Sequence, residues 1–161
     1  MTTEESAAWT SLMRVVELLP VALNAQLQRD SQLTHFEFLV LSALQVSEDP
    51  RIPMSDLARA VNATLPRLSH VCARLEARGL IERHSSHRDG RSRLVTLTRP
   101  GRAALIRAVP GHFETARALV IDALTPAQLA SLREAADAIG ARLDPEQRFV
   151  WTSRADDGEG G

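Results

Sequence analysis

The stretch Arg78–Gly101 reads R-G-L-I-E-R-H-S-S-H-R-D-G-R-S-R-L-V-T-L-T-R-P-G, and it decides the fold. Gly79 suits the end of a helix, and the alternating residues on either side of an Arg- and Gly-rich turn predict the two strands of a β-hairpin. Like charges at a hairpin tip repel one another unless an anion is brought to them. The arginines of this turn therefore indicate an anionic partner, and nucleic acid is the obvious one.

Charge is distributed unevenly along the chain. All 19 basic residues are arginine, which codon usage in a GC-rich genome can also produce, so their placement is more informative than their number. Residues 51–107 contain 12 arginines and 4 acidic residues, a net charge of +8, whereas the remainder has 7 arginines and 16 acidic residues, a net charge of −9. A basic middle between acidic ends is expected where one face of a protein meets phosphate.

The composition bounds the class of protein. The 161 residues are 44% hydrophobic and 24% charged, enough for one globular domain with an added assembly element. The single cysteine, Cys72, excludes an internal disulfide and favours a reducing cytoplasm. The acidic N-terminus and the lack of an apolar run near ~20 residues predict a soluble protein without a membrane span.

Sequence motifs of common enzymes are missing. The chain contains no G-x-S-x-G, no glycine-rich phosphate loop, no HExxH and no paired cysteine site. We therefore expect no catalytic residue, no cofactor and no resident metal.

Hydrophobic periodicity places helices on both sides of the hairpin. Apolar residues at three- and four-residue spacing predict a long amphipathic helix over 6–29, and Thr34 with Glu37 has the form of a capping box that starts a second. Short helices over 54–61 and 64–78, with a turn at Asn62-Ala63, form a helix-turn-helix. A helix bent at Pro110-Gly111 and a last one capped at Thr125 follow. The fold class is thus mainly α with a small β-hairpin.

Three blocks of this region resemble one family. R-L-E-A-R-G-L-I-E-R at 74–83, D-G-R at 89–91 and L-T-R-P-G at 97–101, with Leu57-Ala58 before them, resemble the MarR family of bacterial transcriptional regulators. The resemblance implies a homodimer that binds pseudo-palindromic DNA operators, acts as a repressor, and releases DNA when a small molecule, oxidant or metal binds.

The resemblance also implies an assignment of segments within a single MarR-like domain, 1–161. It makes 34–99 a winged helix-turn-helix lobe, with the recognition helix 64–78 in the major groove and the wing 81–98 in the flanking minor groove. The helices 6–29 and 100–145 would join two subunits, and 154–161 is expected to be a disordered tail.

The recognition helix is expected to turn one face to the core and the other to DNA. The apolar seam predicted to face the core is Leu65, Leu68, Cys72 and Leu75. The residues left facing DNA are Thr64, Pro66, Arg67, Ser69, His70 and Arg74. Arg67 is the best candidate for base readout, because arginine can bind guanine through two hydrogen bonds. His70 carries a weaker charge near neutral pH, so its contact is expected to depend less on salt.

In the wing, Arg91 matches the family's arginine and is expected in the minor groove, where a narrow groove is strongly negative. Asp89 is expected to orient a nearby arginine, while Arg88 and Arg93 contact phosphates or solvent.

The signal that controls binding is open to three readings. The family's effector pocket would lie between the dimer helices and the winged lobe, and an aromatic-lined cleft would suit a phenolic or aromatic carboxylate ligand. Its candidate residues are Trp9, Met13, His35, Phe36, His112 and Phe113, which could equally be dimer core. Oxidation of Cys72, and a metal at His84 and His87 near Asp89, are weaker alternatives, because the thiol lies on the apolar seam and the histidine spacing fixes no tetrahedral site. A winged-helix protein-interaction module that has lost DNA binding is the remaining alternative.

Overall fold

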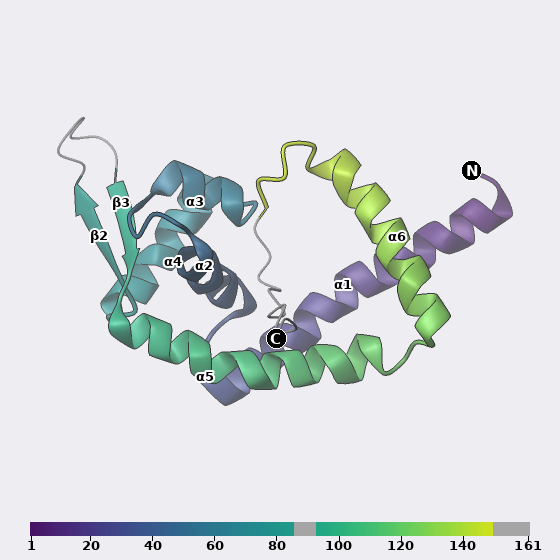
Figure 1. Cartoon of the computed structure of the whole chain (residues 1–161), viewed down its shortest axis with the longest axis horizontal. Coiled ribbons are helices and arrows are strands. Elements are labelled where there is room, and N and C mark those ends of the chain that lie inside the picture. Colours follow the sequence, from purple (N-terminus) through teal and green to yellow (C-terminus); the bar gives the residue numbers. More distant parts are fainter. Residues whose placement is uncertain (86–92, 150–161) are drawn as a thin grey trace, which may run out of the picture.

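The structure is a computed structural model that describes residues 1–85 and 93–149. A compact lobe of short helices and a small sheet occupies one end of the protomer, and long helices extend from it (Figure 1). The elements, in chain order, are α1 Thr3–Ser31, α2 His35–Val46, β1 Ile52–Pro53, α3 Met54–Ala60, α4 Leu65–Ala77, β2 Ile81–Ser85, β3 Arg93–Leu97, α5 Arg99–Ala116, the π-helical turn η1 Arg117–Ile121 and α6 Pro126–Leu143. The predicted fold class, mainly helical with a small hairpin, is confirmed.

Threonine hydroxyls begin most of the helices. Five described helices start directly after a threonine whose side-chain oxygen accepts a backbone N–H: Thr2, Thr34, Thr64, Thr98 and Thr125. Each such cap contributes about 1 kcal/mol. The caps predicted at Thr34 and Thr125 are confirmed. So is the turn at Asn62, whose φ of +49° is tolerated better by asparagine than by most residues.

The sheet is antiparallel, with strand order β1-β3-β2. In the hairpin, Ile81 pairs with Leu97 and Ser85 with Arg93. On the other side of β3, Ile52 of β1 pairs with Val95, a third strand that the sequence did not predict because it is only two residues long and ends in proline. The expected tip residues Arg88, Asp89 and Arg91, and the tail 154–161, lie outside the described residues.

The core of the lobe is aliphatic. Leu68, Cys72 and Leu75 of α4 are fully buried against residues of α2, α3 and the sheet. Leu65 does not belong to it: its side chain is 50% exposed, and Val71, at 7%, completes the buried face. The prediction that Leu65 is buried is therefore wrong. Leu65 is the first residue of α4, and at this end the apolar periodicity of the helix extends beyond the buried core.

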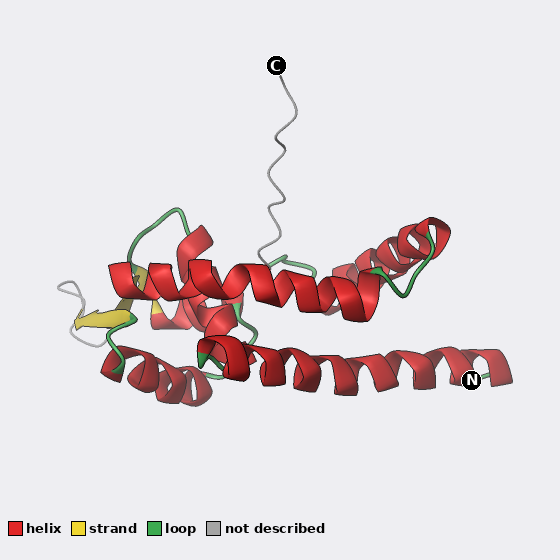
Figure 2. Ribbon diagram, turned by 90° about the horizontal axis from the view of Figure 1, so that it is seen from below, coloured by secondary structure: helices red, strands yellow, loops and turns green. Residues whose placement is uncertain are grey.

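Gly101 joins the long helix α5 to the lobe. A Cβ atom at this position would lie 1.9 Å from the carbonyl oxygen of Leu80, so only glycine lets the first turn of α5 approach the end of α4 so closely. From this junction α5 runs beside α1, away from the lobe (Figure 2). Helix α5 remains α-helical through Pro110 to Ala116 and is followed by the π-helical turn η1, which the sequence did not predict.

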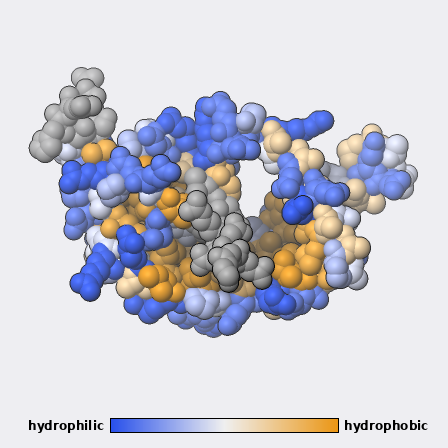
Figure 3. Space-filling view, viewed as in Figure 1, coloured by the Kyte–Doolittle hydropathy of each residue, from blue (hydrophilic) through white to orange (hydrophobic). Residues whose placement is uncertain are grey.

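Most of the exposed large apolar side chains of the described residues lie on the long helices. Figure 3 shows apolar surface on these helices as well as on the lobe. Helix α6 buries none of its residues within the protomer. On α1, the exposed large apolar side chains are Trp9, Leu12, Val15, Val16, Leu18 and Val21. By length and composition alone, α1 could also cross a membrane, with a mean hydropathy of 1.2 over its most apolar window, which corrects the expectation that no segment reaches this length.

Candidate nucleic-acid interface and adjoining cleft

Helix α4 has one buried and one exposed face. All six residues predicted to face DNA from this helix are exposed: Thr64, Pro66, Arg67, Ser69, His70 and Arg74. Thr64 is also the N-cap, since its Oγ1 accepts the backbone N–H of Arg67 at 3.4 Å. The exposed face is thus polar and basic, and the buried seam on the opposite side fixes its orientation relative to the lobe.

Arg67 is held over an aromatic ring. Its guanidinium carbon lies 4.2 Å from the centre of the Phe36 ring, at the start of α2. A cation over a ring face is stabilised by about 0.5–1 kcal/mol at an exposed site. The stacking orients the planar group while leaving its N–H donors available to an acceptor.

Arg74 is held more firmly, by a buried carboxylate. Its Nη2 and Nε donate to Oε1 of Glu37 at 2.6 and 3.2 Å, and Nη1 of Arg78 lies 3.7 Å from Oε2. The Glu37 side chain is only 4% exposed. Burial alone would raise the pKa of Glu37, but hydrogen bonds from Thr34 and Arg74 hold that pKa below its ordinary value. The sequence predicted that the Arg74 side chain reaches DNA, because no local pattern links it to a residue 37 positions earlier.

A second ion pair joins α4 to the hairpin. Nη2 and Nε of Arg83 donate to Oε2 of Glu76 at 2.5 and 2.8 Å, and the Arg83 backbone N–H donates to Oε1 at 3.0 Å. The hydrogen bonds from Arg83 lower the pKa of Glu76. Arg83 is therefore structural, whereas Arg93, at the start of β3, is exposed on the described part of the hairpin.

A cleft of about 750 Å³ adjoins helix α4. Its lining residues come from α1, α2 and α4: Pro20, Val21, Asn24, Thr34, His35, Phe36, Leu39, Arg67, His70, Val71 and Arg74. The cleft thus has apolar walls from α1 and α2 and two guanidinium groups from α4. Arg67, His70 and Arg74 of the expected DNA face also line this cleft, an overlap that the sequence did not predict.

The expected effector residues divide between the cleft and its surroundings. His35 and Phe36 line it. His112, 2% exposed, lies behind, with its ring 6.0 Å from that of His35 and 4.4 Å from that of Phe38. Burial lowers the pKa of both histidines, and His35 lowers that of His112 further. Trp9, Met13 and Phe113 do not line the cleft within the protomer.

The described geometry gives little support to the two alternative signals, oxidation of the cysteine and binding of a metal. Cys72 is fully buried, and burial raises the pKa of its thiol to about 11, so it is a poor thiolate. Nε2 of His84 lies 3.5 Å from Oε2 of Glu82, and His87 is outside the described residues. Within residues 1–85 and 93–149, no group of three or more His, Cys, Asp or Glu side chains could hold a metal ion.

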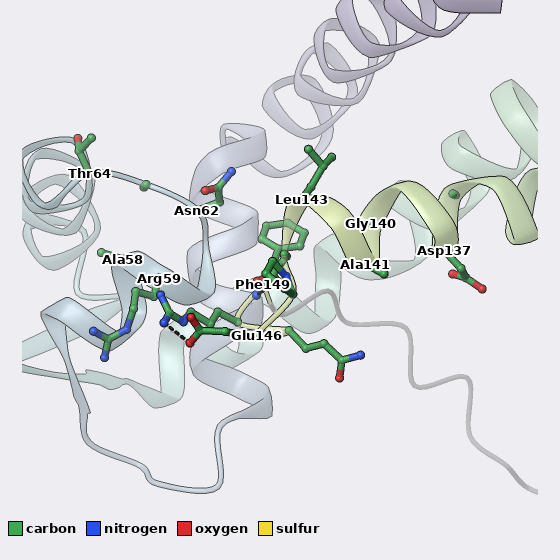
Figure 4. A pocket seen from close by; sticks show the side chains of 16 residues that line it. Ala58, Arg59, Asn62, Thr64, Asp137, Gly140, Ala141, Leu143, Glu146 and Phe149 are labelled. Carbon is green, nitrogen blue, oxygen red and sulfur yellow. Dashed lines mark hydrogen bonds and ion pairs between the residues drawn. The ribbon is translucent and has the colours of Figure 1, made fainter.

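A larger open groove, of about 1290 Å³, separates the α3–α4 turn from the end of α6 (Figure 4). Arg59, Asn62 and Thr64 face it from the lobe, and Gly140 and Leu143 from α6. The described residues that line this groove form no arrangement of side chains suited to catalysis.

Comparisons with known proteins agree with this architecture. The MarR family model matches residues 31–92. Sco3205, a MarR family transcriptional regulator from Streptomyces coelicolor solved in complex with DNA, is 36% identical, with a TM-score of 0.81 over 91% of this chain and 92% of that chain. AbsC, a MarR family transcriptional regulator from the same organism, is 33% identical, with a TM-score of 0.80 over 91% and 98%.

A third similar structure is that of BpsR from Bordetella bronchiseptica, whose DNA binding is regulated by 6-hydroxynicotinic acid. It is 28% identical, with a TM-score of 0.72 over 83% of this chain and 98% of that chain. No protein with a curated description matches the chain. Sco3205 and AbsC are transcriptional regulators and not enzymes, in line with the expectation of a non-catalytic protein. By its identity to both over most of their lengths, the chain belongs to the MarR family of transcriptional regulators.

Proposed function

We propose that this DNA-binding regulator is a cytoplasmic repressor that binds a pseudo-palindromic operator as a homodimer and is released by a small aromatic effector. The recognition helix α4 enters the major groove, and the β2–β3 hairpin follows the flanking minor groove. The exposed face of α4, polar and basic opposite a fully buried seam, is the observation that carries the proposal.

The chemistry of that face suits a duplex. Arg67 can donate two parallel hydrogen bonds to a guanine, which is worth about 1–3 kcal/mol of discrimination. Ser69 and His70 are also exposed on this helix, and their side chains can make polar contacts to bases or phosphates. Arg74 stays paired with Glu37, so it contributes positive potential near the backbone more than a base contact.

The experiment is selection of an operator from random DNA, followed by binding measurements over a salt series. Arg67→Ala is expected to weaken binding to the selected operator about tenfold or more and to reduce its preference for guanine at one position. Arg133→Ala, on α6, removes an equal charge away from the proposed face and is the matched control. Failure of the wild type to bind any fragment at low salt would support the protein-interaction alternative.

The dimer is proposed from the apolar surface of the long helices. Val16 of α1 and Ile139 of α6 are 49% and 43% exposed in a protomer that offers no described partner for either face. A dimer would also place two copies of α4 about one DNA turn, roughly 34 Å, apart. Sedimentation at micromolar concentration should give a dimer for the wild type and a monomer for Val16→Asp. Val46→Asp, at an apolar residue 45% exposed on the lobe, should remain dimeric.

The effector proposal rests on the cleft beside α4. Apolar walls with guanidinium groups at one side suit an aromatic carboxylate or phenolate, and the regulation of BpsR by 6-hydroxynicotinic acid makes that compound a suitable first probe. Because Arg67 and Arg74 also belong to the α4 face, an anion bound in the cleft would compete with DNA for these two positively charged groups. Val21→Trp, which fills the cleft from an exposed position, should abolish release by any active compound without weakening operator binding in its absence.

A further inference from the structure

The first turn of α4 carries an apolar side chain on its exposed surface. Leu65 is the first residue of the helix and is 50% exposed. It follows the N-cap Thr64 and precedes Pro66, both exposed, and Ser69 lies one turn further on the same flank. Single exposed leucines are common on protein surfaces, but this one lies directly beside residues of the proposed DNA face, so its apolar side chain would be brought to the DNA with them.

The described part of the protomer leaves half of the Leu65 side chain uncovered. It lies outside the buried cluster and the half-buried apolar residues that pack against that cluster. It also lines neither the cleft beside α2 nor the groove next to α6. Its exposed neighbours instead place it at the edge of the proposed DNA face.

The major groove offers few apolar groups to such a side chain. The edges of guanine, adenine and cytosine present hydrogen-bond donors and acceptors there, and only thymine presents a methyl group, on C5. A leucine pressed against a donor or acceptor would leave that polar group unpaired, which is unfavourable. Against the thymine methyl it removes apolar surface from water instead.

We infer that Leu65 reads the C5-methyl group of one thymine in each operator half-site, an inference that rests on the proposed binding of α4 in the major groove. Leu65 and Arg67 are two positions apart, about 200° around the helix, so they lie on opposite flanks. The thymine and the guanine read by Arg67 are therefore at different positions of the half-site.

Uracil provides the test, because it differs from thymine only by lacking this methyl group. Each thymine of the selected half-site is replaced in turn, and the dissociation constant is measured for the wild type, Leu65→Ala and Leu65→Met. One replacement is expected to weaken the wild type about fourfold, as for loss of one buried methyl group. The same replacement should leave Leu65→Ala unchanged and weaken Leu65→Met, which keeps an apolar side chain.

Val46→Ala, at an apolar residue that is 45% exposed on the lobe and outside both the α4 face and the long helices, is the matched control and should respond to uracil as the wild type does. If no uracil weakens the wild type, or if one weakens wild type and Leu65→Ala equally, the inference is overturned. It is equally overturned if Leu65→Ala dissociates the dimer in sedimentation, because the side chain then belongs to the subunit interface. Failure of the wild type to bind any selected DNA would instead overturn the proposed function.

Discussion

The guanidinium of Arg74 donates two hydrogen bonds to a single carboxylate oxygen of Glu37, the shorter at 2.6 Å, and so joins α4 to α2. The carboxylate is buried, whereas the arginine remains 46% exposed. Glu37 also closes the capping box of α2 by accepting the backbone N–H of Thr34 at 2.8 Å. One side chain therefore fixes both the start of α2 and its contact with α4.

Glu37→Gln is expected to lower the free energy of unfolding by about 1 to 2 kcal/mol, because glutamine keeps the capping box but removes the charge facing two arginines. The exposure of Arg74 limits the loss. Urea denaturation at one protein concentration measures it. Asp56→Asn, which removes the exposed pair with Arg59, should change stability by less than about 0.5 kcal/mol. Equal effects of the two variants would show that burial adds nothing to the Glu37 contact.

Gly101→Ala is expected to destabilise the protein by about 2 to 4 kcal/mol, because its methyl group would meet the Leu80 carbonyl oxygen at 1.9 Å. Gly140→Ala is the matched control within a helix, since a Cβ there meets nothing within 4 Å. It should raise stability by about 0.5 to 1 kcal/mol. Thermal or urea unfolding of the two variants gives the comparison, and a Gly101→Ala protein as stable as wild type would contradict the close approach of α5.

Stability is expected to fall as the pH drops from 7 to 5, because burial lowers the pKa of His35 and His112 below the ordinary value of 6.5. In this window the unfolded chain binds protons that the folded protein does not, so acid favours unfolding. The loss cannot exceed about 1.4 kcal/mol per pH unit for each histidine. Chemical denaturation from pH 8 to 5 should show a plateau above pH 7, and a smaller slope below it for His112→Phe. An unchanged slope in that variant would exclude His112 as a contributor.

Cys72 is expected to resist alkylation by iodoacetamide in the native protein and to react only after unfolding. Its thiol is fully buried, and its pKa of about 11 leaves almost no thiolate at neutral pH. Mass spectrometry of samples labelled with and without urea measures the difference. Operator binding should accordingly survive peroxide, and rapid native labelling would reopen the redox alternative.

The sequence predicted those parts of the fold that depend on neighbouring residues. The caps at Thr34 and Thr125 and the turn at Asn62 follow from contacts three or four positions apart, which a pattern can express. The pairing of Glu37 with Arg74 and the short strand β1 depend on segments far apart along the chain. The prediction that Leu65 is buried failed for a related reason. Periodicity indicates which face of a helix is apolar, but not where along the helix the core ends.

For the candidate site, the sequence predicted which side chains of α4 are exposed, but not which of them contact other helices. All six residues of the α4 face are exposed as expected, yet two arginines among them contact α2, through Phe36 and Glu37. The shared lining of the cleft likewise arises only when α1, α2 and α4 are packed together.

The hydroxyl of Thr98 makes two hydrogen bonds that together connect the start of α5 to the residues that follow α4. It donates to the carbonyl oxygen of Gly79, just past the end of α4, at 2.7 Å and accepts the backbone N–H of Gly101, in the first turn of α5, at 3.0 Å. The backbone N–H of Thr98 also donates to the carbonyl oxygen of Leu80 at 3.2 Å, and Gly101 packs closely against the same carbonyl group. The start of α5 is thus fixed to the residues that follow α4, so a change in the position of α5 would act first on the end of α4 opposite Thr64.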